Sequence, residues 1–237
     1  MNILITLCAR GGSKGVPGKN IRLINGRPLI DYSIHSAKSF AAKYNADIEL
    51  STDDPKIRSV SANLGLSTSY KRPMHLATDH AGKIETIADL LDFKEKQQQK
   101  IYDFILDLDI SSPLRNLSDL ETAFDLIRND DNALNLFSVN PASRNPYFNM
   151  VEIQENGYYG LIKKGNFLTR QSAPKVYDLN ASFYFFRREF FKQDQPETIN
   201  DRSLVYEMPH ICFDLDQSID FDFMEYILNN NKLGFEL

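Results

Sequence analysis

Apolar residues recur along this chain with two different spacings, and the two spacings alternate. Short and nearly continuous apolar runs, such as NILITLC at 2–8, are typical of strands buried on both faces of a sheet. Apolar residues three and four positions apart, as at 27–40, indicate amphipathic helices. These patterns predict strands at 2–8, 46–52, 103–110, 133–139, 181–187 and 210–216, and helices at 27–40, 54–65, 83–99, 117–129 and 218–229.

Local signals mark several helix ends. Pro55 stands at a first-turn position, and Asp53 precedes it as a candidate N-cap. Ser118 lies three residues before Glu121, which is the spacing of a capping box. These signals support the alternation of strands with helices.

This alternation predicts a single α/β domain over residues 1–237, with a mostly parallel, Rossmann-like sheet and helices on both faces. The carboxyl ends of parallel strands meet at one edge, where open α/β sheets bind ligands. The segments 8–20, 51–55 and 111–115 each follow a predicted strand at that edge. We therefore expect three loops to converge there.

The alternation breaks between about 140 and 180. This stretch has Asn-Pro steps and Asn-Gly and Lys-Gly turns between short aromatic segments, which is typical of antiparallel strands. So short a segment cannot bury a core of its own. We interpret 140–180 as a β-rich excursion from the sheet that needs something to pack on, and a partner subunit is one candidate.

Composition narrows the class of protein. The 237 residues are 42% hydrophobic and 25% charged, as in ordinary soluble proteins, and the net charge of −5 argues against a nucleic-acid or membrane partner. The first ten residues lack the features of a signal peptide or membrane span. Cys8 and Cys212 are predicted to be buried, unreactive thiols. The sequence has no CxxC motif, so a zinc site is not expected. A cytoplasmic location fits these observations.

The segment CARGGSKGVPGKN at 8–20 carries candidate chemistry directly after the first strand. Its glycines let backbone N–H groups turn inward as an anion-binding nest. The motif is not a Walker A sequence, because Asn20 follows Gly18-Lys19, and it is not a G-x-G-x-x-G fingerprint. It predicts a polyphosphate site in which hydroxyl and cationic groups assist, namely Arg10, Ser13, Lys14 and Lys19.

Asp214 and Asp216 form the second candidate constellation. They alternate along the predicted strand 210–216, so both carboxylates would face the same side. Neighbouring carboxylates favour a hard cation such as Mg²⁺ or Mn²⁺. A polyphosphate loop and a metal pair together indicate phosphoryl or nucleotidyl transfer.

Several stretches in order give the chain a family resemblance: ARGGSKGVPGKN (9–20), STDD (51–54), KRPMHLATDHA (71–81), SSPLR (111–115), TRQSAPKVYDLNASFYFF (169–186) and DLDQSIDF (214–221). Over nearly its whole length it resembles the acylneuraminate cytidylyltransferases, also called CMP-sialic acid synthetases. RNPYFNMVEI and RQSAPKVYDLNAS most resemble the branch that activates legionaminic acid, a bacterial sialic-acid analogue. The resemblance implies a fold of the nucleotide-diphospho-sugar transferase type and a homodimer formed through the β-rich insertion.

The resemblance also implies a reaction. CTP and a nine-carbon 2-keto-3-deoxy sugar acid would give the CMP-sugar and pyrophosphate, as the anomeric hydroxyl attacks the α-phosphorus in line. By position, Arg10 and Lys19 would be catalytic, with Asp214 and Asp216 holding Mg²⁺. The implied nucleotide site is Arg10, Gly11, Gly12, Ser13, Lys14, Lys19, Asn20, Arg72, Ala81 and Ser112. The implied acceptor site is Asp109, Arg170, Gln171, Asn180 and Tyr184.

One departure from the family bears on the acceptor. Where the family often has QPTSPLR this chain has DISSPLR, so Asp109 replaces a glutamine expected near the sugar. A carboxylate accepts hydrogen bonds but cannot donate them. Asp109 therefore favours a sugar with other substituents, such as a deoxygenated or doubly N-acylated one, or it joins the metal shell. N-acetylneuraminic acid, pseudaminic acid and an eight-carbon 3-deoxy acid remain alternative acceptors, and a non-catalytic protein that binds CTP or a CMP-sugar is a distant alternative.

Overall fold

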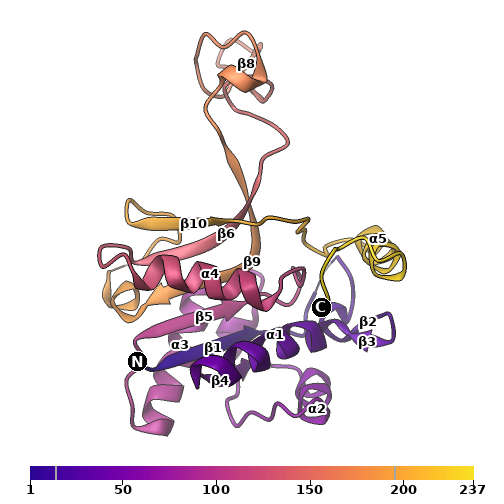
Figure 1. The fold of residues 1–237 in the computed structure, drawn as a ribbon, viewed down its shortest axis with the longest axis vertical. Helices are drawn as coiled ribbons and strands as arrows, with labels where there is room; N and C mark the ends of the chain where they lie inside the picture. The colour runs from indigo at the N-terminus through magenta and orange to yellow at the C-terminus, as the bar shows by residue number, and fades with distance from the viewer. Residues whose placement is uncertain (14, 195) are drawn as a thin grey trace.

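A six-stranded sheet forms the centre of the computed structural model, which describes residues 1–13, 15–194 and 196–237 (Figure 1). The strand order is β10-β6-β9-β5-β1-β4. Strand β9 runs antiparallel to both of its neighbours, and the other pairs are parallel. The mostly parallel α/β sheet is thus confirmed. Its strands are β1 (Ile3–Cys8), β4 (Asp47–Ser51), β5 (Phe104–Leu108), β6 (Asn135–Pro141), β9 (Tyr177–Arg187) and β10 (Ser203–Glu207).

The predicted helices are present with small changes at their ends. They are α1 (Leu29–Tyr44), α2 (Pro55–Asn63), α3 (Lys83–Gln98), α4 (Leu117–Arg128) and α5 (Ser218–Asn229). The short elements are the 3₁₀ turns η1 (Lys19–Ile21), η2 (Met74–Ala77), η3 (Arg170–Ser172) and η4 (Arg188–Lys192), and the strands β2 (Leu23–Ile24) and β3 (Arg27–Pro28). Within the described residues, no helix is long and apolar enough to cross a membrane.

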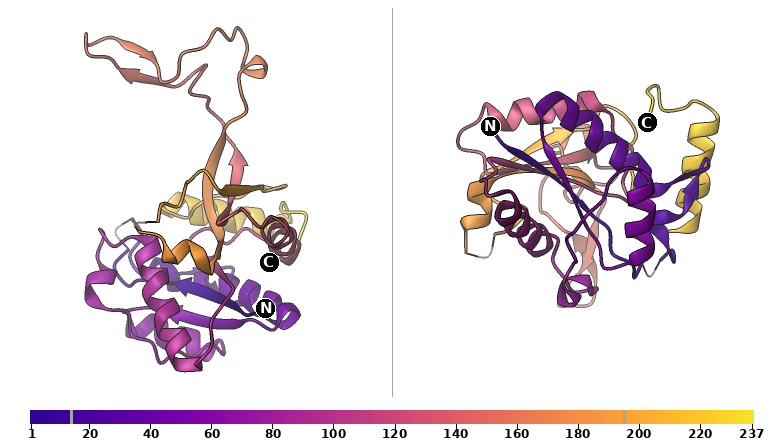
Figure 2. Two further views of the ribbon diagram at one scale, coloured as in Figure 1. Left: turned by 90° about the vertical axis from the view of Figure 1, so that its left-hand side faces the viewer. Right: turned by 90° about the horizontal axis from the view of Figure 1, so that it is seen from below.

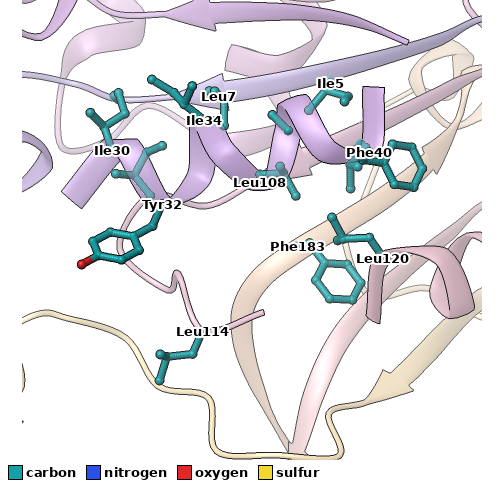
Figure 3. Close-up of a cluster of buried hydrophobic side chains, with 14 of the residues drawn as sticks. Ile5, Leu7, Ile30, Tyr32, Ile34, Phe40, Leu108, Leu114, Leu120 and Phe183 are labelled. Carbon is teal, nitrogen blue, oxygen red and sulfur yellow. The ribbon is translucent and has the colours of Figure 1, made fainter. Parts of the chain in front are cut away.

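The two faces of the sheet bury separate hydrophobic cores, because side chains alternate along each strand. Ile5 and Leu7 of β1 belong to the larger core together with side chains of α1 and α4 (Figure 3). Buried residues of α5 are part of the same core. Leu4 points the other way, into a smaller core that includes Leu91 of α3. Helices therefore cover both faces, and the loops at the strand ends are left free to form a site.

Two of the predicted caps are displaced by one or two residues. The side chain that caps α2 is Asp54, which accepts a hydrogen bond from the backbone N–H of Lys56, and not Asp53. The capping box of α4 pairs Asn116 with Asp119, and not Ser118 with Glu121. In both cases a polar side chain caps the helix start, as predicted. Which of the neighbouring polar residues does so depends on which one has extended backbone at that point.

The predicted strand at 210–216 is wrong, and the edge strand beside β6 is β10 instead. The segment 210–216 crosses the ends of the strands without joining a ladder. Leu215 N–H donates to the Ser111 carbonyl at 2.8 Å, and the Asn140 side chain donates to the Cys212 carbonyl at 2.7 Å. Cys212 and Leu215 of this segment are buried in the larger core, which is why the segment resembles a strand in the sequence. Strand alternation therefore does not explain where Asp214 and Asp216 point.

The excursion projects from the sheet as an arm (Figures 1 and 2). Strands β6 and β9 lead into it, and it carries an antiparallel hairpin of β7 (Val151–Ile153) and β8 (Tyr159–Leu161). This confirms the predicted antiparallel β character. The arm leaves many large apolar side chains exposed, among them Val151, Ile153, Tyr158, Tyr159 and Leu168.

Candidate active site

The loops after β1, β4 and β5 converge at one edge of the sheet, as predicted. Ala9 N–H donates to the Ser51 carbonyl at 2.9 Å, and Gly11 N–H donates to Asp53 Oδ1 at 3.0 Å. These bonds join the loop after β1 to the loop after β4. The third loop contributes Ser111 to the same place.

A cleft of about 360 Å³ lies where these loops meet. It is polar on most of its surface, and it brings predicted phosphate and nucleotide residues together with one predicted acceptor residue, Asp109, and one predicted metal residue, Asp216. Asp214 is not among the residues that line it. A larger cavity of about 580 Å³ beside α5 contains none of the predicted site residues. We therefore take the smaller cleft as the candidate active site. It is lined by Cys8, Arg10, Ser13, Gly15, Lys19, Asn20, Asp109, Ile110, Ser111 and Asp216.

Both described cations of the β1 loop are paired with carboxylates. Arg10 Nη1 lies 2.6 Å from Asp79 Oδ1, and Lys19 Nζ lies 3.0 Å from Asp216 Oδ1. The Lys19 side chain is mostly buried, whereas Asp216 is 71% exposed. A phosphate group entering the cleft would compete with these carboxylates for the same cations. Lys14, predicted to join them, lies outside the described residues.

Gly15 brings the loop into contact with the acidic segment, and the sequence reasoning did not select it. A Cβ at this position would lie 2.4 Å from the carbonyl oxygen of Asp216. No side chain fits there, so glycine permits the close approach. The signal in the sequence that could have identified Gly15 was its place in a dense run of glycines. By contrast, a Cβ at Gly12 would meet nothing within 4 Å.

Asp214 is a buried acid with an unsatisfied oxygen. Its Oδ1 is buried and has no hydrogen-bond partner among the described residues. Burial, together with the negative charges of Asp109 and Asp216, raises the pKa of Asp214 to about 6. An orphaned carboxylate oxygen near two other acids fits a cation.

The two carboxylates of Asp214 and Asp216 suit Mg²⁺ better than a metal that needs several protein ligands. Among the residues that the structure describes, no three His, Cys, Asp or Glu side chains form a metal site. Mg²⁺ is usually held by one or two carboxylates together with substrate phosphates and water. Asp214 and Asp216 therefore fit the ion, with a nucleotide supplying the remaining oxygens.

Lys83 is a second residue that the sequence reasoning missed. Its Nζ lies 2.8 Å from Asp109 Oδ2, 3.3 Å from Asp107 Oδ2 and 4.6 Å above the ring of Tyr184. Burial alone would lower the pKa of Lys83, but Asp109 and Asp107 raise it well above the usual value. Lys83 therefore carries a positive charge beside the cleft. This side chain begins α3 and had no local motif around it.

Several predicted residues have internal partners. Arg72 is buried and donates through Nε to Ser51 Oγ at 2.8 Å. Ser112 is fully buried and donates to the Asn180 carbonyl at 2.7 Å, while the Asn180 side chain donates to Asn140 at 2.6 Å. Ala81 is partly exposed in the loop that precedes helix α3. The neighbouring Ser111, and not Ser112, lines the cleft.

Arg170 and Gln171 are not brought to the cleft within this chain. They line a separate cavity of about 400 Å³ at the base of the arm, together with Asn145 and Glu207. Arg170 Nη2 donates to the Ala142 carbonyl there at 2.7 Å. The acceptor residues predicted on the arm thus lie apart from Asp109 and Tyr184.

Both cysteines are free thiols. Cys212 is buried as predicted, whereas Cys8 is only partly buried at the end of β1, where it lines the cleft. Burial raises the pKa of Cys8 to about 12 and also raises that of Cys212. Neither thiol is therefore activated as a nucleophile.

An open α/β sheet in which a glycine-rich loop, paired cations and acids meet at the carboxyl edge is typical of nucleotide-binding proteins. The chain belongs to the cytidylyltransferase family, whose model, described as Cytidylyltransferase, matches residues 4–232. The sequence-based assignment to a cytidylyltransferase is thus confirmed.

Relatives with assigned names agree with this class. The chain is 42% identical over 231 residues to post-translational flagellin modification protein B of Campylobacter coli, covering 98% of this chain and 97% of that protein. It is 41% identical over 232 residues to CMP-N,N'-diacetyllegionaminic acid synthase of Campylobacter jejuni, with the same coverage. Among solved structures, CMP:2-keto-3-deoxy-manno-octonic acid synthetase complexed with CTP has a TM-score of 0.70 at 17% identity, covering 98% of this chain and 100% of that chain. This last similarity supports the fold.

Proposed function

We propose that this cytidylyltransferase activates a nonulosonic acid of the legionaminic type with CTP, giving the CMP-sugar and pyrophosphate. The observation that carries the proposal is the meeting of Arg10 and Lys19 with Asp109 and Asp216 in one cleft. The 41% identity to a CMP-N,N'-diacetyllegionaminic acid synthase supports the choice of acceptor.

In the proposed reaction the anomeric oxygen of the sugar acid bonds to the α-phosphorus. The bond from that phosphorus to the bridging oxygen breaks, pyrophosphate leaves, and the hydroxyl proton passes to water. Arg10 and Lys19 would exchange Asp79 and Asp216 for the triphosphate and balance the charge that grows on the leaving group. Backbone N–H groups at Gly11 and Gly12, with Ser13 and Lys14, would complete the phosphate site.

Asp214 and Asp216 would hold Mg²⁺, or Mn²⁺, against the triphosphate. When bound, the ion would supply charge neutralisation at the phosphate oxygens. The rest of the nucleotide would lie near Asn20, Arg72, Ala81 and Ser112. Since Arg72 and Ser112 already bond to neighbouring protein groups, their role would be to support the pocket walls.

We further propose that the arm at 140–180 forms a homodimer. A two-stranded hairpin is marginal alone, and the exposed Val151, Ile153 and Tyr159 make an apolar surface unusual for a monomer. A dimer would also allow Arg170 and Gln171, which lie apart from their own cleft, to serve the acceptor of a second subunit. We place the reaction in the cytoplasm, in keeping with two free cysteines.

The direct test supplies the purified chain with CTP, Mg²⁺ and a panel of acids, and measures pyrophosphate release and the CMP-sugar. The panel holds N,N'-diacetyllegionaminic, N-acetylneuraminic, pseudaminic and eight-carbon 3-deoxy acids. We expect the first to give the highest kcat/KM. A chain that binds CTP and forms no product with any acid would be a binding protein, and the proposal would be wrong.

Lys19→Ala tests the phosphate role. We expect turnover to fall about a hundredfold or more, because a charge-assisted contact to the triphosphate is lost. Lys43→Ala is the matched control, since Lys43 pairs with Glu121 at 2.7 Å on a distant surface. If the Lys19 variant lost stability and its folded fraction kept normal turnover, the assigned role would fail.

A further inference from the structure

Lys83 occupies an unfavourable position for a cation. It is the first residue of α3, where the backbone N–H groups give the helix a positive end. A lysine at such a site is stabilised only if nearby acids compensate for the repulsion. Asp107 and Asp109 provide that compensation, and both come from the end of β5 and the residues that follow it.

The same helix contains a second lysine–acid pair that allows a comparison. Lys94 Nζ lies 2.8 Å from Glu49 Oε2, the same distance as Lys83 from Asp109. Lys94 is eleven residues further along the helix, which places it about 16 Å away from Lys83. Glu49 is buried in β4, whereas Asp109 lines the cleft. Of these two pairs, the Lys83 pair is the one that a substrate in the cleft can contact.

The bonds to Asp109 fix its carboxylate. Its Oδ1 accepts from both the N–H and the hydroxyl of Ser111 at 2.8 Å each, and its Oδ2 accepts from Lys83. Burial alone would raise the pKa of Asp109, but the charge and hydrogen bond of Lys83 and the bonds from Ser111 lower it to about 2. A carboxylate has about four acceptor sites, so roughly one remains for a ligand.

A fixed anion at this point of the cleft selects what can bind beside it. It repels the carboxylate of a sugar acid, which must therefore point elsewhere. It attracts an N–H or O–H donor. A glutamine amide can pair with either a hydrogen-bond donor or an acceptor of the ligand. An ionised carboxylate can pair only with a donor, so it selects ligands that present one at this point.

We propose that Lys83 is a positioning residue that holds Asp109 as a hydrogen-bond acceptor for an acylamino N–H of the sugar acid, and thereby sets acceptor specificity. This inference rests on the proposed function. It assigns to the Lys83–Asp109 pair the discrimination between acids that carry an acylamino group there and acids that lack it. It also gives a role to a lysine that lies at a helix start, where a cation is electrostatically disfavoured.

The test compares two acceptors at saturating CTP and Mg²⁺: N,N'-diacetyllegionaminic acid and an eight-carbon 2-keto-3-deoxy acid without acylamino groups. For Lys83→Met we expect the KM of the diacetyl acid to rise ten- to a hundredfold, the scale of one hydrogen bond to a charged group. The KM for CTP should stay within about twofold. The preference for the diacetyl acid should fall by the same factor, and Lys83→Arg should restore part of it.

Lys94→Met is the matched control, because it breaks an ion pair of equal length in the same helix away from the cleft. It should lower the melting temperature and leave the preference unchanged. Should Lys83→Met not fold, Ser111→Ala removes one donor to Asp109 without stranding a charge, and it should shift the preference in the same direction by a smaller factor.

Equal losses with both acids, or equal rises in the KM values of CTP and acceptor, would overturn the inference while leaving the proposed function intact. If the unmodified chain formed product with neither these acids nor the others in the panel, the proposed function would fail and this inference with it.

Discussion

Gly15→Ala tests whether the contact between the glycine loop and the acidic segment is needed for catalysis. The added methyl would lie 2.4 Å from the Asp216 carbonyl oxygen, and ordinary contacts begin at 3.4 Å. The loop and the segment must therefore separate by about 1 Å. Because the partner atom is backbone, a side-chain rotation cannot relieve the clash.

A displacement of about 1 Å in a catalytic constellation costs on the order of a hundredfold in rate. We expect kcat/KM to fall about a hundredfold, measured by pyrophosphate release. Overpacking of this kind costs about 1–3 kcal/mol, and for a chain of this size each kcal/mol lowers the melting temperature by about 2–4 °C. The variant should therefore remain folded at 25 °C while losing most of its activity.

Gly12→Ala is the comparison within the same loop. It adds the same methyl group, keeps the backbone N–H and meets nothing within 4 Å. It should retain at least ten times the activity of Gly15→Ala. Equal activity of the two variants, or a Gly15→Ala protein as active as the unmodified chain, would show that the close approach to Asp216 does not matter for the reaction.

Three further outcomes follow from the site and the arm. Asp79→Asn should lower the KM for CTP two- to fivefold, because it frees Arg10 from a partly exposed ion pair worth at most about 1 kcal/mol; a higher KM from initial rates would contradict this. The pKa of Asp214 is raised from 3.8 to about 6, so its contribution to stability is present below pH 3.8 and is lost as the pH rises through about 6. Asp214→Asn should therefore raise the melting temperature in metal-free buffer more at pH 8 than at pH 5, and equal gains at both values would refute the assignment. If the arm forms the proposed dimer, the unmodified chain should sediment as a dimer in analytical ultracentrifugation and Ile153→Asp, in exposed β7, as a monomer; an unmodified chain that is monomeric, or a variant that stays dimeric, would contradict the proposed interface.

Local patterns predicted most of the fold, because each helix and each buried strand has its own hydrophobic period. Strand β10 was missed since its side chains are only partly buried at the sheet edge, so its alternation is weak. The segment 210–216 was misassigned for the opposite reason. Cys212 and Leu215 are buried by packing under the larger core, and burial alone does not distinguish a strand from a covered loop.

The residues of the candidate site likewise fall into those that the sequence predicted and those that only the structure revealed. Arg10, Ser13, Lys19 and Asn20 were accessible to sequence reasoning, because a glycine-rich loop after a buried strand is a continuous motif. Lys83 was not, since its partners Asp107 and Asp109 lie 24 and 26 positions further along the chain. The unsatisfied oxygen of Asp214 was equally hidden, because only packing shows which oxygen loses contact with water.

By itself the sequence determined the class of fold, the phosphate-type loop and the family, since these depend on residues that are neighbours in the chain. Only the tertiary structure decided that Lys19 meets Asp216 across 197 positions, that Lys83 holds Asp109, and that Arg170 lies away from the cleft. The reason is physical. Backbone conformation follows local hydrophobic period and turn chemistry, whereas charge pairing and burial depend on which segments pack together.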